Sequence, residues 1–389
     1  MSHQSVPHRY RTASMGGNRP AGENPPLQSS RRLAPRTLRG VAAILVTVIV
    51  MALSAQPAAP GETRLPSTSN RPPRKVIVGT SMQAFCGEYP GLEKRLAELE
   101  GIIDRMAEEA QRKYGRPLDL AVLPETAVTG EVAGEAIESC VPFEGPVKEA
   151  FTRKARERHC YIVVPTYLLE TQGKRTCSNV GILVGRQGEV VGIYRKLHLA
   201  VPAGSDSMEG GSTPGKEVPV FACDFGKLGI QICFDMEYDY GWGQLARKGA
   251  ELVAWPTQSP QTAQPAFRAM QHRYYIVSST WRNNAAIFEP TGRITAQIKP
   301  PEQVLVQEID LSYALLPWSK ELRNGEALRE KYGDKVGFRY YEDEDRGIFW
   351  SNDPSVTIGE MVHSIGVAEE EDEFLRIQRL FHKAGVPGS

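Results

Sequence analysis

The sequence is poor in the features that mark several large protein classes. Its apolar run at residues 41–53 has 13 residues, short of the roughly 20 needed to cross a bilayer, and a polytopic membrane protein is therefore excluded. None of its six cysteines forms a C-x-x-C pair, and its seven histidines show no metal-binding spacing, which excludes a zinc ribbon or a thioredoxin-like motif. With 41% hydrophobic and 24% charged residues, the composition is that of a globular protein.

The absence of net charge conceals two segments of opposite sign. The chain of 389 residues has 46 basic and 46 acidic side chains. Residues 1–74 contain ten arginines, no lysine and only two acids, so this segment carries +8 and the remainder carries −8. The remainder therefore offers no overall basic charge of the kind that attracts nucleic acid, and we expect no nucleic-acid partner.

The arginine-rich segment has the organisation of an export signal. Arg31, Arg32, Arg36 and Arg39 precede the apolar run, and small residues and prolines follow it. A basic region, a short apolar core and a small-residue exit are typical of a secretory signal peptide. We expect residues 1–74 to be a leader that ends in a disordered linker, and the protein to be exported to the periplasm or outside the cell. The alternative is an uncleaved N-terminal segment that anchors the protein in the membrane.

Short β-rich runs alternate with helical stretches from Lys75 onward. Residues 76–80, 118–124 and 161–169 have strand character. Residues 92–113 carry apolar side chains at spacings of three and four, which indicates an amphipathic helix. Hairpin-like pairs of strands follow later in the chain. This order predicts a mixed sheet covered by helices, an α/β layered fold.

The apolar rhythm weakens beyond about residue 316. We therefore expect residues 75–315 to form one large domain. Residues 316–389 are expected to be a C-terminal extension that packs on this domain or on a dimer partner. A separate small domain is the less favoured interpretation, because the extension has so few apolar positions in regular order.

Three reactive side chains stand at the C-terminal ends of predicted strands. Glu125 follows AVLP, Lys196 lies in GIYRKLHL, and Cys233 lies in LGIQICFD. Open α/β sheets gather their chemistry at this edge. Taken singly, the two charged residues fit solvent-exposed positions, and the cysteine fits a small buried hydrophobic residue. Together they supply a base, a cation for an oxyanion and a nucleophile, which are the parts needed for acyl transfer.

The motifs LPET (123–126), YRKLHL (194–199) and GIQICFDMEY (229–238), in that order, resemble those of the nitrilase superfamily of carbon–nitrogen hydrolases. The resemblance covers roughly residues 75–311. It implies a four-layer α-β-β-α sandwich that usually forms a homodimer or a higher homo-oligomer. It also implies catalysis that requires neither a cofactor nor a metal.

The resemblance assigns a role to each reactive residue of this sequence. Glu125 is the general base, Lys196 the oxyanion stabiliser and Cys233 the nucleophile, and the N–H of Phe234 completes the oxyanion hole. Many members add a second glutamate after the lysine motif, a few residues before a Pro-Gly pair. Glu209 is the matching residue here and would orient Lys196 and the substrate, although an ordinary loop charge is the alternative.

The sequence departs from the superfamily just after the nucleophile, where substrate is recognised. Amidase-like members often read C-Y-D-x-R-F-P-E, whereas this chain has Glu237 at the basic position and lacks the following Pro-Glu. For this reason the resemblance does not identify a particular substrate for this sequence. Trp255, Gln258 and Tyr238 are the candidates for substrate contact, with the core as the alternative place for the aromatic residues.

The sequence therefore predicts a hydrolase of non-peptide carbon–nitrogen bonds in a small molecule. The bond is an amide or N-carbamoyl group, cleaved through a cysteine thioester with release of ammonia or an amine. A nitrilase or an amide acyltransferase is the alternative within the superfamily. A catalytically silent binding scaffold on the same fold is the alternative of a different class.

Overall fold

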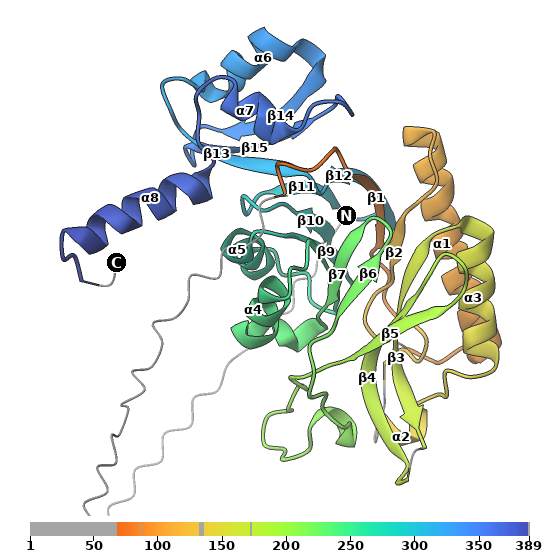
Figure 1. Cartoon of the computed structure of the whole chain (residues 1–389). Helices are drawn as coiled ribbons and strands as arrows, with labels where there is room; N and C mark the ends of the chain where they lie inside the picture. Colours follow the sequence, from red (N-terminus) through yellow and green to blue (C-terminus); the bar gives the residue numbers. More distant parts are fainter. Residues whose placement is uncertain (1–67, 86, 132–135, 172, 388–389) are drawn as a thin grey trace, which may run out of the picture. The chain divides into compact units, whose positions relative to one another are not determined.

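A computed structural model of the chain describes residues 68–85, 87–131, 136–171 and 173–387 (Figure 1). The predicted signal segment at residues 41–53 lies outside these residues. Within them, none of the helices combines the length and the apolar character that a membrane span requires.

The first five strands of the described chain and the later strand β12 form a six-stranded mixed sheet. Its strand order is β12-β1-β2-β3-β4-β5. The pairs β1–β2 and β2–β3 are parallel, and the other pairs are antiparallel. The strands are β1 (Lys75–Ser81), β2 (Leu120–Val122), β3 (Tyr161–Glu170), β4 (Thr176–Val184), β5 (Val190–Arg195) and β12 (Val304–Asp310).

A second six-stranded sheet repeats this pattern with the order β11-β10-β9-β8-β7-β6. Its central pairs β7–β8 and β8–β9 are parallel, and its outer pairs are antiparallel. The strands are β6 (Val220–Cys223), β7 (Gly226–Ile230), β8 (Leu252–Pro256), β9 (Tyr275–Ser279), β10 (Ala285–Phe288) and β11 (Ile294–Ile298).

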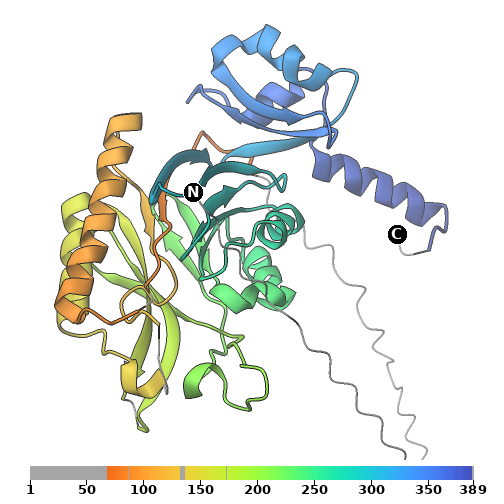
Figure 2. The ribbon, with the colours of Figure 1, turned by 180° about the vertical axis from the view of Figure 1, so that it is seen from behind.

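Helices cover the outer face of each sheet (Figures 1 and 2). The first sheet is covered by α1 (Leu92–Tyr114) and α3 (Pro146–Arg158), and the second by α4 (Asp239–Arg247) and α5 (Ala263–His272). The inner faces share one core in which branched apolar residues of both sheets are fully buried, among them Val78, Val122, Leu228, Ile230 and Val277. The predicted four-layer α-β-β-α sandwich is confirmed.

The C-terminal extension forms a third sheet, with the order β13-β15-β14. It has its own apolar cluster, which includes Leu328, Phe349 and Met361. The described residues nevertheless belong to one compact unit. The elements are β13 (Tyr313–Pro317), β14 (Val336–Tyr341), β15 (Arg346–Ser351), α6 (Glu326–Tyr332), α7 (Ile358–His363) and α8 (Glu370–Lys383).

Strand β13 crosses the boundary expected at residue 315. Tyr313 and Leu315 belong to the core between the two large sheets, whereas Ala314 and Leu316 belong to the cluster of the extension. Alternate side chains of a strand point to opposite faces, so this one strand joins two cores. The extension therefore packs on the sandwich through a shared strand, and the expected boundary falls inside an element.

Candidate active site

The four residues assigned catalytic roles come from different strands but lie in one place. Glu125 follows β2, Lys196 follows β5, and Cys233 follows β7 of the opposite sheet. Glu209 comes from the long loop between β5 and β6. The C-terminal ends of strands from both sheets meet at this edge, and the loops beyond them carry the polar side chains into the sandwich.

Lys196 is the centre of the site. Its side chain is fully buried, and its Nζ lies 2.9 Å from Glu125 Oε1 and 3.0 Å from Glu209 Oε2. Burial alone would lower the pKa of Lys196, but the charges of Glu125, Cys233 and Glu209 together raise that pKa well above the usual value. The side chain is therefore a fixed ammonium, already oriented before any substrate enters.

Glu209 is held in place by neutral donors from the first sheet and from the loop that follows β5. Asn179 Nδ2 donates to Glu209 Oε1 at 2.6 Å and to Glu125 Oε1 at 3.0 Å, and thus bridges the two carboxylates. Tyr167 OH donates to Glu209 Oε1 at 2.9 Å, and the Ala200 N–H donates to Oε2 at 3.2 Å. The backbone φ of Glu209 is 43°, a costly value for a residue with a side chain, and these contacts maintain it.

Asn179 and Tyr167 were not among the site residues predicted from the sequence. The two residues face each other in the β3–β4 register, so their functional role depends on a strand pairing. A polar side chain in an otherwise apolar strand, as in SNVGILV at residues 178–184, is the signal that could have found Asn179.

Glu125 has the surroundings of a general base. Its Oε2 is buried and has no conventional hydrogen-bond partner among the described residues. The Cys233 thiol is the reactive neighbour that interacts with this carboxylate. Burial raises the pKa of Glu125; Lys196 opposes this effect and Glu209 adds to it. The Trp281 indole N–H donates to the Glu125 carbonyl at 2.9 Å and fixes the backbone below the carboxylate.

Cys233 opens a short 3-10 helix, η2 (Cys233–Glu237), with a backbone φ of 42°. This strained conformation presents the side chain at the end of the strand. Burial and the Glu125 charge raise the pKa of Cys233 to about 12, although Lys196 and the Gln258 backbone N–H act in the other direction. The resting sulfur is therefore a thiol, which would have to lose its proton to a neighbouring base before it could attack as a nucleophile.

A buried carboxylate two residues after the nucleophile organises the turn. Asp235 is fully buried and accepts hydrogen bonds from the Ile232 N–H at 3.0 Å and from Tyr194 OH at 2.7 Å. It also accepts from the His198 N–H at 2.9 Å. Because Tyr194 and His198 flank Lys196, Asp235 connects the nucleophile turn to the segment that carries the ammonium. Asp235 was not among the site residues predicted from the sequence.

The residues expected to contact substrate lie in three different settings. Trp255 is fully buried, and its indole N–H donates to the Cys233 carbonyl at 3.2 Å. In this structure the ring packs behind the turn of Cys233 and supports its backbone, and a contact between Trp255 and substrate stays a prediction. Gln258 interacts with the Cys233 sulfur through its backbone N–H. Tyr238 is exposed and stacks on His198 with ring centroids 4.2 Å apart.

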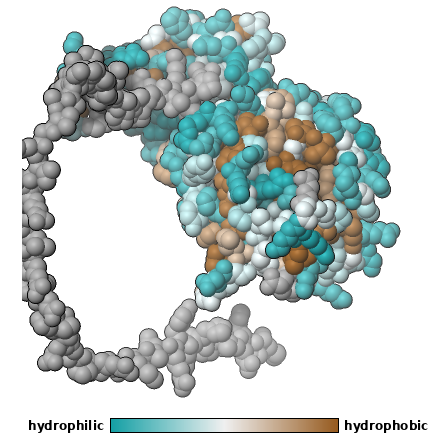
Figure 3. Space-filling model, turned by 60° about the horizontal axis from the view of Figure 1, so that its bottom comes forward, coloured by the Kyte–Doolittle hydropathy of each residue, from teal (hydrophilic) through white to brown (hydrophobic). Residues whose placement is uncertain are grey.

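Hydrophobic patches interrupt the polar surface on the face that Figure 3 turns forward, at the bottom of Figure 1. Near the nucleophile, the exposed aromatic side chains are Phe234, Tyr238 and Tyr240. In the loop that carries Glu209, Val201 and Met208 are exposed as well. Apolar surface beside a charged catalytic group is typical of a small-molecule site.

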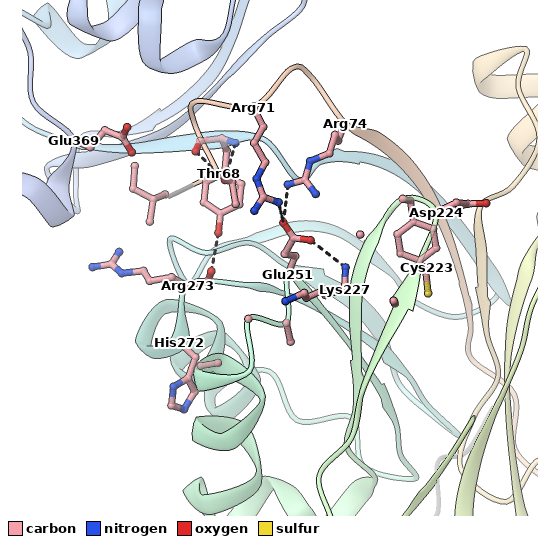
Figure 4. Close-up of a pocket in the computed structure, with 18 of the residues that line it drawn as sticks. Thr68, Arg71, Arg74, Cys223, Asp224, Lys227, Glu251, His272, Arg273 and Glu369 are labelled. Carbon is pink, nitrogen blue, oxygen red and sulfur yellow. Dashed lines mark hydrogen bonds and ion pairs between the residues drawn. The ribbon is translucent and has the colours of Figure 1, made fainter. Parts of the chain in front are cut away.

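A separate cavity of about 320 Å³ lies at the opposite ends of β7 and β8, away from the nucleophile (Figure 4). Its central carboxylate, Glu251, accepts hydrogen bonds from Arg71 at 3.1 Å, Arg74 at 2.7 Å and the Lys227 N–H at 3.0 Å. These groups fasten the segment before β1 to the second sheet. The cavity contains none of the four assigned catalytic residues, so we do not include it in the active site.

The part of the chain that the structure describes contains no group of three or more His, Cys, Asp and Glu side chains suited to a metal ion.

The chain is similar to known carbon-nitrogen hydrolases. The family model described as carbon-nitrogen hydrolase matches residues 90–315. The deaminated glutathione amidase of Homo sapiens is 26% identical over 221 residues, which cover 50% of this chain and 67% of that protein. Omega-amidase NIT2 of Danio rerio is 25% identical over 239 residues, covering 54% of this chain and 84% of that protein.

Solved structures share the fold at low sequence identity. Nit3 of Saccharomyces cerevisiae, a member of the nitrilase superfamily, has a TM-score of 0.53 and 19% identity, and covers 61% of this chain and 90% of its own. The NitFhit protein of C. elegans has a TM-score of 0.53 and 20% identity, with 62% of each chain covered. The matched family model extends over more than half of the sequence. The chain therefore belongs to the carbon-nitrogen hydrolase family of the nitrilase superfamily, and is a hydrolase of carbon–nitrogen bonds other than peptide bonds.

Proposed function

We propose that the protein cleaves a small-molecule amide or N-carbamoyl group through a thioester on Cys233. The observation that carries this proposal is the buried arrangement in which Lys196 contacts Glu125 and Glu209 beside the thiol. A buried ion cluster of this kind is costly to assemble. Perturbed ionisable groups that converge beside a nucleophile are typical of a catalytic site.

The first half-reaction forms the thioester. Glu125 takes the proton of Cys233 as the sulfur attacks the carbonyl carbon. Negative charge then develops on the former carbonyl oxygen, where the Lys196 ammonium and the N–H of Phe234 stabilise it. Protonated Glu125 gives its proton to the departing nitrogen, and ammonia or an amine leaves.

The second half-reaction uses the same groups with water in place of the thiol. Ionised Glu125 takes a proton from water, and the resulting hydroxide attacks the thioester carbonyl. The tetrahedral intermediate collapses, and the Cys233 sulfur departs and recovers its proton from Glu125. Glu209, held by Asn179 and Tyr167, keeps Lys196 oriented through both steps.

Release of ammonia from a panel of amides, ureido acids and nitriles tests this proposal. Turnover of amides or ureido acids supports it, whereas turnover of nitriles alone favours the nitrilase alternative. Acyl transfer to an added amine in preference to water would favour the acyltransferase alternative. Because the relatives named above are amidases, short terminal amides are the first members of the panel.

The charge of Glu237 bears on which charge the substrate carries. This residue stands at the end of η2, at the position that is basic in many amidase-like members. It accepts hydrogen bonds from Gln261 at 3.4 Å and Gln264 at 3.2 Å, and is exposed on the nucleophile's side of the second sheet. An acid at this place disfavours anionic amides and favours neutral or cationic ones.

We therefore expect Glu237→Arg to change the ratio of kcat/KM for a carboxylate-bearing amide to that for a matched ammonium-bearing amide by about fivefold, in favour of the anion. Steady-state kinetics on the two amides measures this ratio. Glu302→Arg, an equal charge reversal at another exposed site, is the control and should leave the ratio unchanged. A ratio that moves equally in both variants would contradict a local role for Glu237.

A homodimer or higher homo-oligomer is part of the proposal, with α8 as one contact between subunits. The helix carries exposed Phe374, Leu380 and Phe381, of which 65%, 53% and 50% are accessible. Acidic residues occupy its first turn and basic residues its second half. Two copies packed antiparallel would therefore place acids opposite bases and cover the apolar side chains.

The double variant Phe374→Asp/Phe381→Asp is expected to lower the mass of the assembly, because four charges would enter the helix pair. Light scattering coupled to size exclusion measures this mass. Trp318→Asp, at a site 60% exposed in the loop after β13, is the matched control and should keep the assembly. Wild-type protein that is already monomeric, or a variant with the wild-type mass, would refute a contact through α8.

We also propose that the protein is exported, with membrane anchoring through residues 41–53 as the alternative. The support is the basic, apolar and small-residue order of the leader. Fractionation of cells that express the full chain should place the mature protein outside the cytoplasm and shortened at its N-terminus. Full-length protein confined to the cytoplasm would contradict export.

A further inference from the structure

Two buried thiols next to the active site have no part in the proposed reaction. Cys140 and Cys177 belong to a small apolar cluster together with Ala136 and Tyr167. They are 7% and 1% exposed. Tyr167 is the residue whose hydroxyl donates to Glu209, so this cluster lies directly behind the second glutamate.

The backbone brings the two cysteines together from different elements. Cys140 follows the short helix α2 (Ala136–Ser139), and Cys177 lies in β4. The Cys140 N–H and the Cys177 thiol both donate to the Ala136 carbonyl, at 2.9 Å and 3.3 Å. The Cys140 thiol donates to the Ile137 carbonyl at 3.3 Å, and the two thiols are close enough to interact with each other.

Hydrogen bonds to strand β3 also hold the segment of Cys140 close to Cys177. The Val141 N–H donates to the Tyr167 carbonyl at 3.1 Å, and the Leu169 N–H donates to the Val141 carbonyl at 2.8 Å. Leu169 is the register partner of Cys177 in β4. The residue after Cys140 is thus paired with the strand that neighbours Cys177, and Figure 1 shows α2 at the ends of β3 and β4.

We propose that Cys140 and Cys177 are a disulfide-forming pair that joins α2 to β4 behind the loop of Glu209. The oxidant is a low-molecular-weight disulfide. One cysteine thiolate attacks it and releases one thiol, and the second cysteine then displaces the other thiol. Each cysteine loses one proton, the two sulfurs together lose two electrons, and the small disulfide is reduced to two thiols.

Burial determines when this exchange can occur. It raises the pKa of the Cys177 thiol, and the neighbouring Cys140 thiol adds to the effect. The reactive thiolate is therefore scarce in the folded protein, and the bond should form during folding, before the cluster closes. Such a bond suits the export proposed above, although it depends only on the two thiols and an oxidant.

A bond between Cys140 and Cys177 would close a loop in the unfolded chain and reduce its entropy. We expect the melting temperature to rise by about 5 °C or more. The bond would also hold the site: the Cys177 carbonyl accepts from the Thr213 N–H at 2.7 Å, close to the loop that carries Glu209.

The test uses the full chain with Cys233→Ala, so that the proposed nucleophile cannot react. This protein is refolded with a mixture of reduced and oxidised glutathione, digested without reduction and analysed by mass. The expected result is one linked peptide pair containing Cys140 and Cys177, and a melting temperature that falls when dithiothreitol is added before refolding. Because the readout is a bond and not turnover, it is independent of the proposed reaction.

Matched variants make the result specific. Cys140→Ala and Cys177→Ala should each abolish the linked pair and the response to dithiothreitol, whereas Cys160→Ala, also a buried cysteine, should retain both. Comparison of each variant with and without dithiothreitol removes any stability change due to the substitution itself. Free thiols at both positions, linkage of either one to another cysteine, or a bond that leaves the melting temperature unchanged would overturn the proposal.

Discussion

Replacement of Cys233 by alanine is expected to reduce amide hydrolysis by about four orders of magnitude or more, because no other group can form the thioester. The fold should persist. The substitution removes one sulfur atom from a partly exposed position and leaves the hydrogen bonds of Asp235 and Trp255 to the turn intact. The thermal unfolding temperature should stay within a few degrees of that of the wild type.

The measurement is ammonia release from the best amide of the panel, compared with thermal unfolding of the same preparation. Cys223→Ala is the control, since this thiol lies in β6 and lines the separate cavity rather than the catalytic site. It should retain wild-type turnover. Ammonia release by the Cys233→Ala protein at more than a few per cent of the wild-type rate would refute a thioester on this residue.

A covalent trap separates an enzyme from a silent scaffold on the same fold. An electrophilic amide analogue should add one equivalent of mass to the intact wild-type protein, and peptide mapping should place it on Cys233. The Cys233→Ala protein should take up none. Binding of the analogue without a covalent adduct would favour a scaffold whose three reactive residues no longer act together.

Much of the sandwich could be predicted from the sequence because its elements are long and regular. The helix expected at residues 92–113 is observed at Leu92–Tyr114, where Leu99, Ile103 and Met106 are fully buried in one apolar stripe. The C-terminal extension was harder to predict. Its elements are short, and β13 divides its apolar residues between two cores, so no single period of hydrophobicity extends across the boundary.

The residues of the candidate site that carry reactive side chains could be predicted from the sequence. The residues that act through hydrogen bonds to other parts of the chain could not. Glu125, Lys196 and Cys233 stand in recognisable motifs, and the structure brings them together. Asp235 and Asn179 act through hydrogen bonds to distant parts of the chain, which a sequence without strand pairings does not contain.

The strained backbone conformations at the site could not be predicted from the sequence either. Thr126, Glu209 and Cys233 have φ values of 52°, 43° and 42°, yet none of them is a glycine, the residue that normally signals such a conformation. These positions are next to, or part of, the assigned machinery. Tertiary contacts such as those of Asp235 and Asn179 therefore hold the strained backbone where the chemistry requires it.

The pH profile of kcat/KM should have an acid limb that lies above the ordinary glutamate range. Burial raises the pKa of Glu125 above its usual value of 4.5, and the residue must be ionised to accept the thiol proton. Activity should therefore fall as the pH decreases through that raised pKa. Since the pKa of Cys233 is about 12 and that of Lys196 is raised further above 10.5, the profile should remain flat to about pH 10.

Ionisation of Glu125, which is expected to increase activity, should decrease the free energy of unfolding. The folded state binds the Glu125 proton more tightly than the unfolded state does, so ionisation of Glu125 opposes folding. The free energy of unfolding is expected to decrease as the pH rises from 4.5 through the raised pKa. Urea unfolding at several pH values measures this slope, and the slope attributable to Glu125 should disappear when the residue is replaced by glutamine.

Glu125→Gln is expected to lower kcat by about three orders of magnitude or more, because an amide cannot accept the thiol proton. The variant should still fold. The glutamine Oε1 can accept the hydrogen bonds that Lys196 Nζ and Asn179 Nδ2 donate to Glu125 Oε1, at 2.9 Å and 3.0 Å. Its Nε2 would then replace Oε2, the oxygen without a conventional partner, and would face the thiol with a donor where an acceptor is needed.

Alkylation of Cys233 by iodoacetamide separates this loss from a structural defect. In the wild type, the rate of alkylation should rise as Glu125 ionises and can take the thiol proton. In Glu125→Gln, the rise in rate that accompanies ionisation of Glu125 should disappear, and the rate should increase only as the solution pH approaches the pKa of the thiol itself, which is lower than in the wild type because the Glu125 charge no longer raises it. Glu131→Gln, a neutralisation at an exposed residue, is the control and should keep the wild-type profile. An unchanged alkylation profile in Glu125→Gln would show that another group takes the proton, and would remove Glu125 from the role of base.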